Sequence, residues 1–161
     1  MNMRKFTRSA MLMALSCVLT MFPQIPVPTG GYVHFGDSII YIAAAFLGPV
    51  PAAIVGALGH SLADVLSGYI IFALPTFIIK GIAGFIIGKI LYDKTDIRHI
   101  ILAGIAALVV VTLGYFVAES IIYGVSVAML SLISSPIQWL MSVLATAAFV
   151  PLLARVKMKK N

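Results

Sequence analysis

The chain has 161 residues, of which 61% are hydrophobic and only 10% are charged, and its formal net charge is +6. Soluble domains contain roughly 45–50% apolar and about 25% charged residues, so this composition excludes an ordinary soluble protein and predicts that most of the chain lies in a lipid bilayer. At about 20 residues per crossing there is room for at most six or seven spanning helices, which predicts a single helical domain over residues 1–161.

Apolar segments follow one another along the chain, at about 6–22, 38–48, 51–66, 75–92, 99–125 and 132–154. The second and third are short and are separated only by "GPVP", residues 48–51. Proline removes a helix N–H and clashes with the preceding turn, which favours a break or hairpin there. A kink inside one long helix is the alternative.

The positions of the basic residues distinguish these alternatives. Ten of the eleven Lys and Arg residues fall in three clusters, at residues 4–8, 89–98 and 155–160. Positively charged residues near helix ends stay on the cytoplasmic side, and only a hairpin at residues 48–51 puts all three clusters there. The sequence therefore predicts an all-α integral membrane protein with six transmembrane helices and both termini cytoplasmic. Topology and anionic lipid explain the net charge, so no nucleic-acid partner is predicted.

Polar side chains that this topology does not explain fall at one depth, toward the outer side. They are His34, Asp37, His60, Asp64, Lys80, Glu119, Gln138 and Trp139. Ionisable groups at membrane depth cost roughly 2.5–3.5 kcal/mol each on insertion scales and usually face a cavity or a partner. The pattern predicts a polar cup that opens outward, with rings for a flat ligand from Tyr32, Tyr69, Phe72, Tyr115, Tyr123 and Trp139.

Structural roles compete with binding for several of these residues. Asp64, Lys80 and Glu119 could pair with one another to hold the helices together, and tyrosine and tryptophan also collect at membrane interfaces. Lys80 is expected about one and a half turns into a helix that begins at Pro75. For Asp37 the favoured role is capping, because "GDS" suits a helix N-terminus, where a carboxylate accepts from free amides.

The sequence contains no motif for catalysis or for a cofactor. Walker A, G-x-S-x-G and H-E-x-x-H patterns are absent, and the single cysteine, Cys17, has no partner for a disulfide. His34 and His60 are interpreted as hydrogen-bonding residues, so no metal site is predicted. We expect a protein that is not an enzyme, and any ATP-driven transport would need a partner that hydrolyses ATP.

Small residues recur at helical spacing in two places. Gly81, Gly84 and Gly88 follow one another along the fourth segment, and this pattern is typical of close packing between helices. Ala10 and Ala14 form a small-xxx-small pair in the first segment, which could pack inside the bundle or dock another membrane protein.

The stretch from Gly31 to Ile90 resembles the substrate-binding S components of energy-coupling factor (ECF) vitamin transporters, in the riboflavin-transporter-like branch. The likeness lies in "HFGDSIIYIAAAFLGPVPAAIVGALGHSLADVLSGY" and in "LPTFIIKGIAGFIIGKI". It implies a six-helix protein of the bacterial plasma membrane that works with a transmembrane coupling subunit and two ATPases. It also implies that Ala10 and Ala14 contact the coupling subunit, and that residues 23–36 act as a lid.

The same resemblance implies a substrate pocket in the outer half of the bundle. The substrate-binding residues predicted there are Tyr32, His34, His60, Asp64, Lys80, Tyr115, Glu119, Gln138 and Trp139. A small cup with one deep acid and one lysine favours a single heteroaromatic ring with hydroxymethyl groups, such as pyridoxine or hydroxymethylpyrimidine. Riboflavin and queuosine precursors are alternatives.

Two functions of other classes stay open at this stage. A proton-coupled secondary transporter could use Asp64 and Glu119 as proton carriers, although no broken helix or internal repeat is apparent. A small membrane enzyme is less favoured, because no catalytic cluster is present.

Overall fold

The computed structural model describes residues 3–26 and 32–158, and it describes side chains as far as residue 151. The elements in chain order are α1 (Met3–Met21), β1 (Ile25–Pro26), β2 (Tyr32–Val33), α2 (Asp37–Leu47), α3 (Pro49–Leu66), α4 (Ile70–Leu91), α5 (Ile97–Tyr123), α6 (Val125–Ala128) and α7 (Ser131–Met158). This confirms the prediction of an all-α protein. The six predicted segments correspond to α1, α2, α3, α4, α5 and α7.

The start of α4 differs from the prediction. The helix begins at Ile70, so Pro75 lies inside it rather than at its first turn. A proline near the start of a membrane helix removes only one backbone hydrogen bond, and neighbouring helices can compensate for that loss. Lys80 consequently lies about three turns into the helix rather than one and a half.

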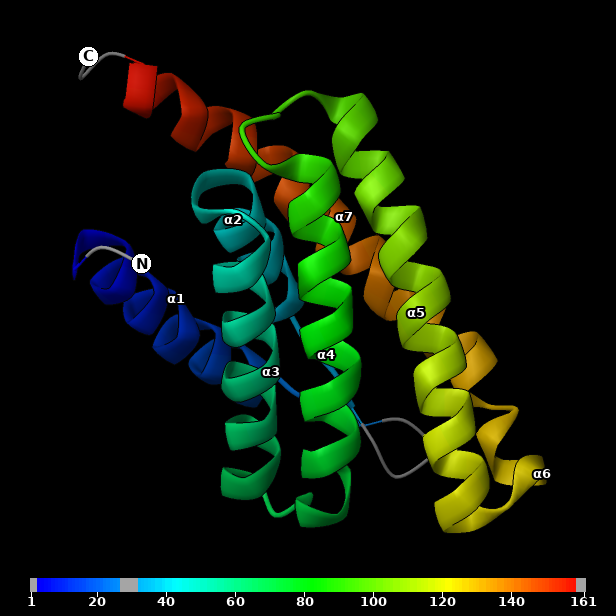
Figure 1. Ribbon diagram of the computed structural model, residues 1–161. Helices are drawn as coiled ribbons and strands as arrows, with labels where there is room; N and C mark the ends of the chain where they lie inside the picture. Colours follow the sequence, from blue (N-terminus) through cyan, green and yellow to red (C-terminus); the bar gives the residue numbers. More distant parts are fainter. Residues whose placement is uncertain (1–2, 27–31, 159–161) are drawn as a thin grey trace.

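A tight turn joins α2 to α3, as the prolines predict. Gly48 has a φ of 96°, in the left-handed region that glycine adopts without a Cβ clash, and α3 begins directly afterwards at Pro49. From this turn α3, α4 and α5 run in alternating directions (Figure 1). The turn at Gly48, the α4–α5 connection and the end of α7 therefore lie at one end of the bundle, and the α3–α4 turn and α6 lie at the other.

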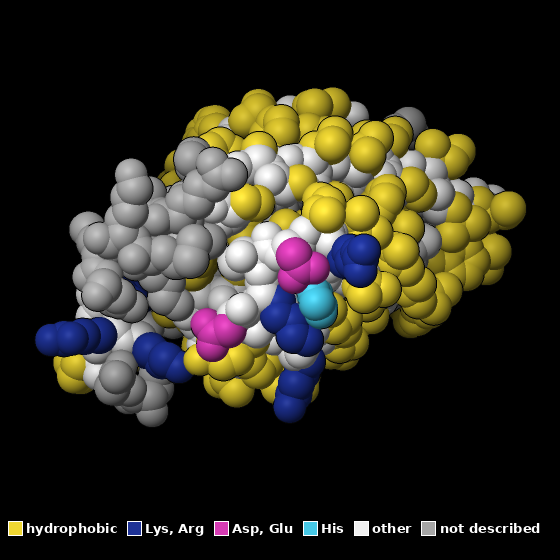
Figure 2. Space-filling view, turned by 90° about the horizontal axis from the view of Figure 1, so that it is seen from above, with side chains coloured by type: hydrophobic (Ala, Val, Ile, Leu, Met, Phe, Trp, Pro, Cys, Tyr) yellow, Lys and Arg dark blue, Asp and Glu magenta, His cyan; other side chains and the backbone are white. Residues whose placement is uncertain are grey.

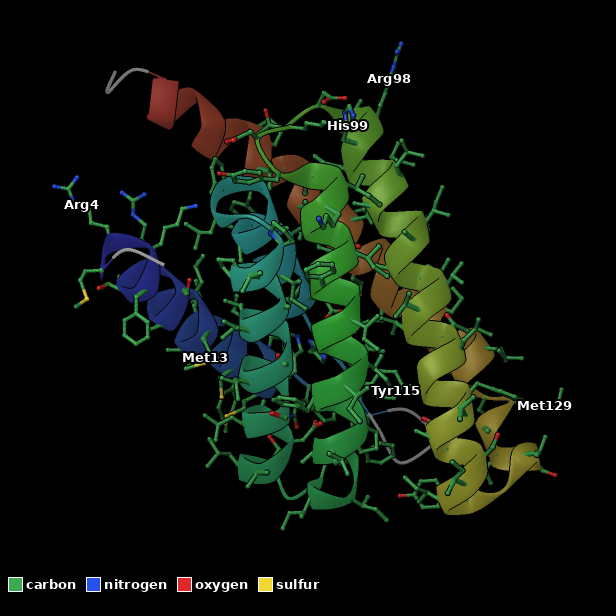
Figure 3. The ribbon with its side chains drawn as sticks, viewed as in Figure 1. Arg4, Met13, Arg98, His99, Tyr115 and Met129 are labelled. Carbon is green, nitrogen blue, oxygen red and sulfur yellow. The ribbon has the colours of Figure 1, made fainter. Side chains whose placement is uncertain are left out.

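Basic side chains gather at the end that contains Gly48. Figure 2 views this end and shows Lys and Arg side chains on it, with hydrophobic side chains on the surrounding surface. Arg4 and Arg98 lie toward this end, whereas Met129 lies at the opposite end (Figure 3). The C-terminal cluster, residues 155–160, lies outside the described side chains.

The helix α2 occupies the interior of the bundle. It packs against α1, α3, α4 and α7, and nine of its eleven residues are buried. At about 1.5 Å per residue it spans roughly 16 Å, about half the hydrocarbon core of a bilayer. Four helices of the described chain are long and apolar enough to cross a membrane, and α2 is not among them. The prediction of six spanning helices is thus met only in part.

Glycines allow α3 and α4 to approach closely. A Cβ added at Gly84 would lie 2.5 Å from the carbonyl oxygen of Ala52, and one added at Gly56 would lie 2.6 Å from that of Lys80. A side chain at either position would force the two backbones apart. The glycine pattern of α4 therefore serves packing within the bundle, and Gly56 of α3 lets the Lys80 backbone lie directly against that helix.

Candidate functional site

A cavity lies in the half of the bundle opposite the basic end, between the long helices and the β1–β2 hairpin. The residues that line it come from α1, β2, α3, α4, α5 and α7. They are Thr20, Tyr32, Val33, His34, His60, Asp64, Phe72, Thr76, Lys80, Val111, Tyr115, Glu119, Ser131, Ser134, Ser135 and Gln138. Every predicted substrate-binding residue except Trp139 is in this set.

A buried ion pair lies beside the cavity, which only its lysine, Lys80, lines. The ammonium of Lys80 donates to both carboxylate oxygens of Asp37, each at 2.7 Å, and Lys80 is only 2% exposed. Nε2 of His60 lies 3.0 Å from one of these oxygens. Asp37 is the first residue of α2, but its carboxylate makes no capping hydrogen bond to that helix. The capping role predicted for Asp37 is therefore wrong: the carboxylate joins α2 to α3 and α4.

His60 connects this ion pair to the packing of α1. Its Nδ1 lies 3.1 Å from the carbonyl oxygen of Gly56 and 3.3 Å from the hydroxyl of Ser16. The side chain is 1% exposed, and its Nε2, although close to Asp37, makes no hydrogen bond to a described residue. His60 thus links α1 and α3 through its Nδ1 and places its Nε2 beside the carboxylate of α2.

Gln138 links the β2 segment to α7. Its side-chain oxygen accepts from the backbone N–H of His34 at 2.8 Å, and its side-chain nitrogen donates to the backbone oxygen of His34 at 2.9 Å. The same nitrogen donates to Asp37 at 3.1 Å. One amide therefore satisfies both backbone groups of His34 and connects them to the Asp37–Lys80 pair.

Three of these residues could in principle bind a metal ion. Ligand atoms of His34, Asp37 and His60 lie within 4.8 Å of one another. The ammonium of Lys80 already occupies both oxygens of the Asp37 carboxylate, however, and a metal ion would have to displace it. Nδ1 of His34 also faces the N–H of Gly36 at 3.1 Å. The arrangement therefore favours an ion-pair network over a metal centre.

The β1–β2 hairpin is fastened to the far end of α3. The hydroxyl of Tyr32 donates to the Asp64 carboxylate at 2.7 Å, and Gln24 donates to the hydroxyl of Ser67 at 2.9 Å. The rings of Tyr32 and Tyr69 lie 4.8 Å apart. Residues 27–31 of the predicted lid lie outside the described residues, so the anchors described here belong to its two flanks.

Aromatic and acidic groups from α4 and α5 form the opposite wall. The hydroxyl groups of Thr76 and Tyr115 lie 3.0 Å apart, and the Lys80 ammonium lies 5.8 Å from the centre of the Tyr115 ring. Figure 3 shows Tyr115 between α4 and α5. Glu119, four residues further along α5, is 4% exposed and also lines the cavity. A flat ligand could therefore meet an aromatic ring and a carboxylate on the same wall.

Trp139 does not line this cavity, contrary to the prediction. It borders a separate, smaller hollow with Asp37, Gln138 and Ser142. Successive residues of a helix point about 100° apart, so Trp139 is turned away from the main cavity, whereas Gln138 lies between the two and borders both. A Cβ added at Gly104 of α5 would lie only 2.8 Å from the indole nitrogen of Trp139. Trp139 therefore packs closely against α5.

Sequence reasoning missed the serines of α7. Buried polar residues recur at Ser131, Ser135, Gln138 and Ser142, which are spaced four, three and four residues apart. This spacing places them on one helix face and was visible in the sequence as a polar stripe in an apolar segment. Three of the four line the main cavity, and Ser142 borders the smaller hollow.

Comparisons with known proteins find one matching family model and two relatives. The family model described as "ECF-type riboflavin transporter, S component" matches residues 1–156. An uncharacterized protein in a gap 3′ region of Pyrococcus woesei is 38% identical over 108 residues, covering 66% of this chain and 72% of the relative. The thiamine precursor transporter HmpT of Lactococcus lactis subsp. cremoris (strain MG1363) is 27% identical, covering 96% of this chain and 90% of the relative.

A solved structure shares the fold. The crystal structure of FolT bound with folic acid superposes with a TM-score of 0.67, at 23% sequence identity and with 91% of each chain covered. At this level of identity the likeness concerns the arrangement of the helices only.

Proposed function

Because the chain belongs to the S-component family of ECF-type riboflavin transporters, we propose that it captures a small water-soluble vitamin or precursor, pyridoxine or hydroxymethylpyrimidine, from outside the cell. The family consists of multi-pass membrane transport components and not of enzymes. The observation that carries the proposal is the cavity itself, in which an aromatic ring, serine hydroxyls and carboxylates surround one polar space. A ring with amino or hydroxymethyl groups matches these partners.

The Asp37–Lys80 pair bears on the choice of substrate. A lysine that is free in a pocket would attract an anionic ligand, but here its charge is balanced by Asp37 at 2.7 Å. The proposal therefore assigns Lys80 to the frame of the cavity, and assigns contact with the ligand to Tyr32, Asp64, Tyr115 and Glu119. The description of HmpT as a thiamine precursor transporter supports a pyrimidine, since hydroxymethylpyrimidine is such a precursor.

The cavity is proposed to face outward. Basic residues mark the cytoplasmic side of a membrane protein, and the described basic clusters lie at the end of the bundle away from the cavity. Residues 32–34 of the 23–36 segment line the cavity, and hydrogen bonds from Tyr32 to Asp64 and from Gln24 to Ser67 hold both flanks at the end of α3, which supports a lid role.

Release of substrate to the inside is proposed to need a coupling subunit and two ATPases. Ala10 and Ala14 are exposed on α1, so another helix could approach them closely. Uptake by this chain without an ATPase would instead favour the proton-coupled secondary transporter.

Mass spectrometry of the small molecule that co-purifies with the protein tests the proposed substrate. Isothermal titration of the purified protein with hydroxymethylpyrimidine, pyridoxine, riboflavin and a queuosine precursor then ranks the candidates. We expect the single-ring compounds to bind most tightly. Tight binding of riboflavin with no binding of either single-ring compound would overturn the proposed substrate but not the family.

A further inference from the structure

Asp64 has a carboxylate oxygen that the surrounding residues leave without a hydrogen bond. The side chain lines the cavity from α3, and the residue is only 5% exposed. Its Oδ1 accepts from Tyr32 at 2.7 Å, whereas Oδ2 has no hydrogen-bond partner among the described residues. The hydroxyl of Thr76 is near this carboxylate and lies 3.0 Å from that of Tyr115, and either of these two hydroxyl groups can be the donor of that pair. A buried acceptor without a donor is costly, so a ligand that supplies the donor gains affinity.

The charges around the cavity favour the same kind of ligand. Lys80 is the only Lys or Arg among the described residues that line it, and its ammonium is held on Asp37. Asp64 and Glu119 also line the cavity. The lining therefore has two carboxyl groups and one ammonium, and the charge of that ammonium is already balanced by Asp37. Phosphate or carboxylate groups brought into this space would face like charge in a medium of low dielectric constant, where repulsion is strong.

We propose that Asp64 determines specificity by accepting a hydrogen bond from an amino group or a protonated ring nitrogen of the ligand, and that the cavity rejects phosphate esters of the same ring. This inference rests on the proposed function, because it concerns the ligand of the same cavity. Besides lining the cavity, Tyr32 positions this carboxylate: by donating to Oδ1 it leaves Oδ2 as the oxygen for the ligand.

Three compounds on one ring test the inference on the unmodified protein. They are 4-amino-5-hydroxymethyl-2-methylpyrimidine, the same pyrimidine without its amino group, and its monophosphate ester. Each is titrated by calorimetry into the detergent-purified chain. We expect the amino compound to bind about tenfold to a hundredfold more tightly than the compound without the amino group, and the monophosphate to bind at least as weakly.

The Asp64→Asn variant then tests the residue. Asparagine keeps the shape but can present an NH₂ group to the ligand donor, so the amino compound should lose about tenfold to a hundredfold in affinity. The compound without the amino group should change little, a contrast that a purely structural role would not produce. Asp96→Asn, an exposed carboxylate at the basic end, is the matched control. Tyr32→Phe should give a smaller loss with the same ligand preference.

The outcomes separate this inference from the proposed function. Equal losses for both pyrimidines in Asp64→Asn, or a monophosphate that binds the unmodified protein as tightly as the amino compound, would overturn the role of Asp64 while leaving capture of a pyrimidine intact. If Asp64→Asn fails to fold, the three-compound series on the unmodified protein still tests whether the cavity prefers the amino group and rejects the phosphate ester. If none of the three binds and riboflavin does, the proposed substrate fails, and this inference fails with it.

Discussion

Asp37 and Lys80 are 43 residues apart in the sequence, yet the Lys80 ammonium lies 2.7 Å from both oxygens of the Asp37 carboxylate. The pair joins the short interior helix α2 to α4. Because Gln138 and His60 also contact the carboxylate, one acidic group ties α2 to α3, α4 and α7. The pair is therefore the centre of the framework that holds the cavity open between these helices.

Replacing Lys80 with Met should destabilise the protein strongly. The change leaves a buried carboxylate without its cation, and breaking such a pair costs roughly 3–5 kcal/mol. The double variant Asp37→Asn with Lys80→Met should recover much of this loss, because no unpaired charge is left. Thermal unfolding in one detergent, followed by circular dichroism, measures both effects.

Lys89→Met is the matched control for this experiment. Lys89 is exposed on the same helix, so its loss should change the unfolding temperature little. A Lys80→Met variant as stable as Lys89→Met would contradict the structural role assigned to the pair.

Gln138→Ala should loosen the β2 segment. The substitution leaves the N–H and the carbonyl of His34 without their partner, and each buried group that loses its hydrogen bond costs about 1–3 kcal/mol. Hydrogen exchange followed by mass spectrometry on the peptide around residues 32–36 should become faster, while α5 peptides stay protected. Ser134→Ala, on the same helix, is the control. Unchanged exchange at residues 32–36 would show that the amide does not hold this segment.

The helices and the location of the cavity could be predicted from the sequence. Which polar side chains contact one another around the cavity could not. Apolar segments and the prolines at 49 and 51 indicate the helices and the turn between α2 and α3, although Pro75 misplaces the start of α4, and the level of each polar residue follows from the direction of its helix. Which side chains meet depends on how each helix is rotated about its own axis relative to its neighbours. Asp37 was therefore assigned to capping and Trp139 to the cavity, although α2 turns the first inward to Lys80 and α7 turns the second toward α5.

A cysteine introduced at Val50 should react only from the cytoplasmic side. Val50 is 56% exposed and follows the turn at Gly48, at the end with the basic clusters. A cysteine at Val125, 59% exposed in α6 at the opposite end, should react with an impermeant maleimide in intact cells. Both are made in a Cys17→Ser background, which serves as the unlabelled control. Labelling of Val50→Cys from outside would reverse the topology and turn the cavity toward the cytoplasm.

Replacing Ala10 and Ala14 together with Leu should abolish assembly with the coupling subunit. Both residues are exposed on α1, so the larger side chains disturb no interior packing but keep another helix at a distance. Ligand affinity of the isolated chain should therefore stay the same, while vitamin uptake and co-purification of the coupling subunit are lost. Ala148→Leu, the same kind of substitution at one exposed position of α7, should preserve both vitamin uptake and co-purification of the coupling subunit. A double variant that still co-purifies with the coupling subunit would show that docking uses another face. In that case the small residues of α1 would have to be explained by contact with lipid, since their exposure leaves them no partner helix within the described bundle.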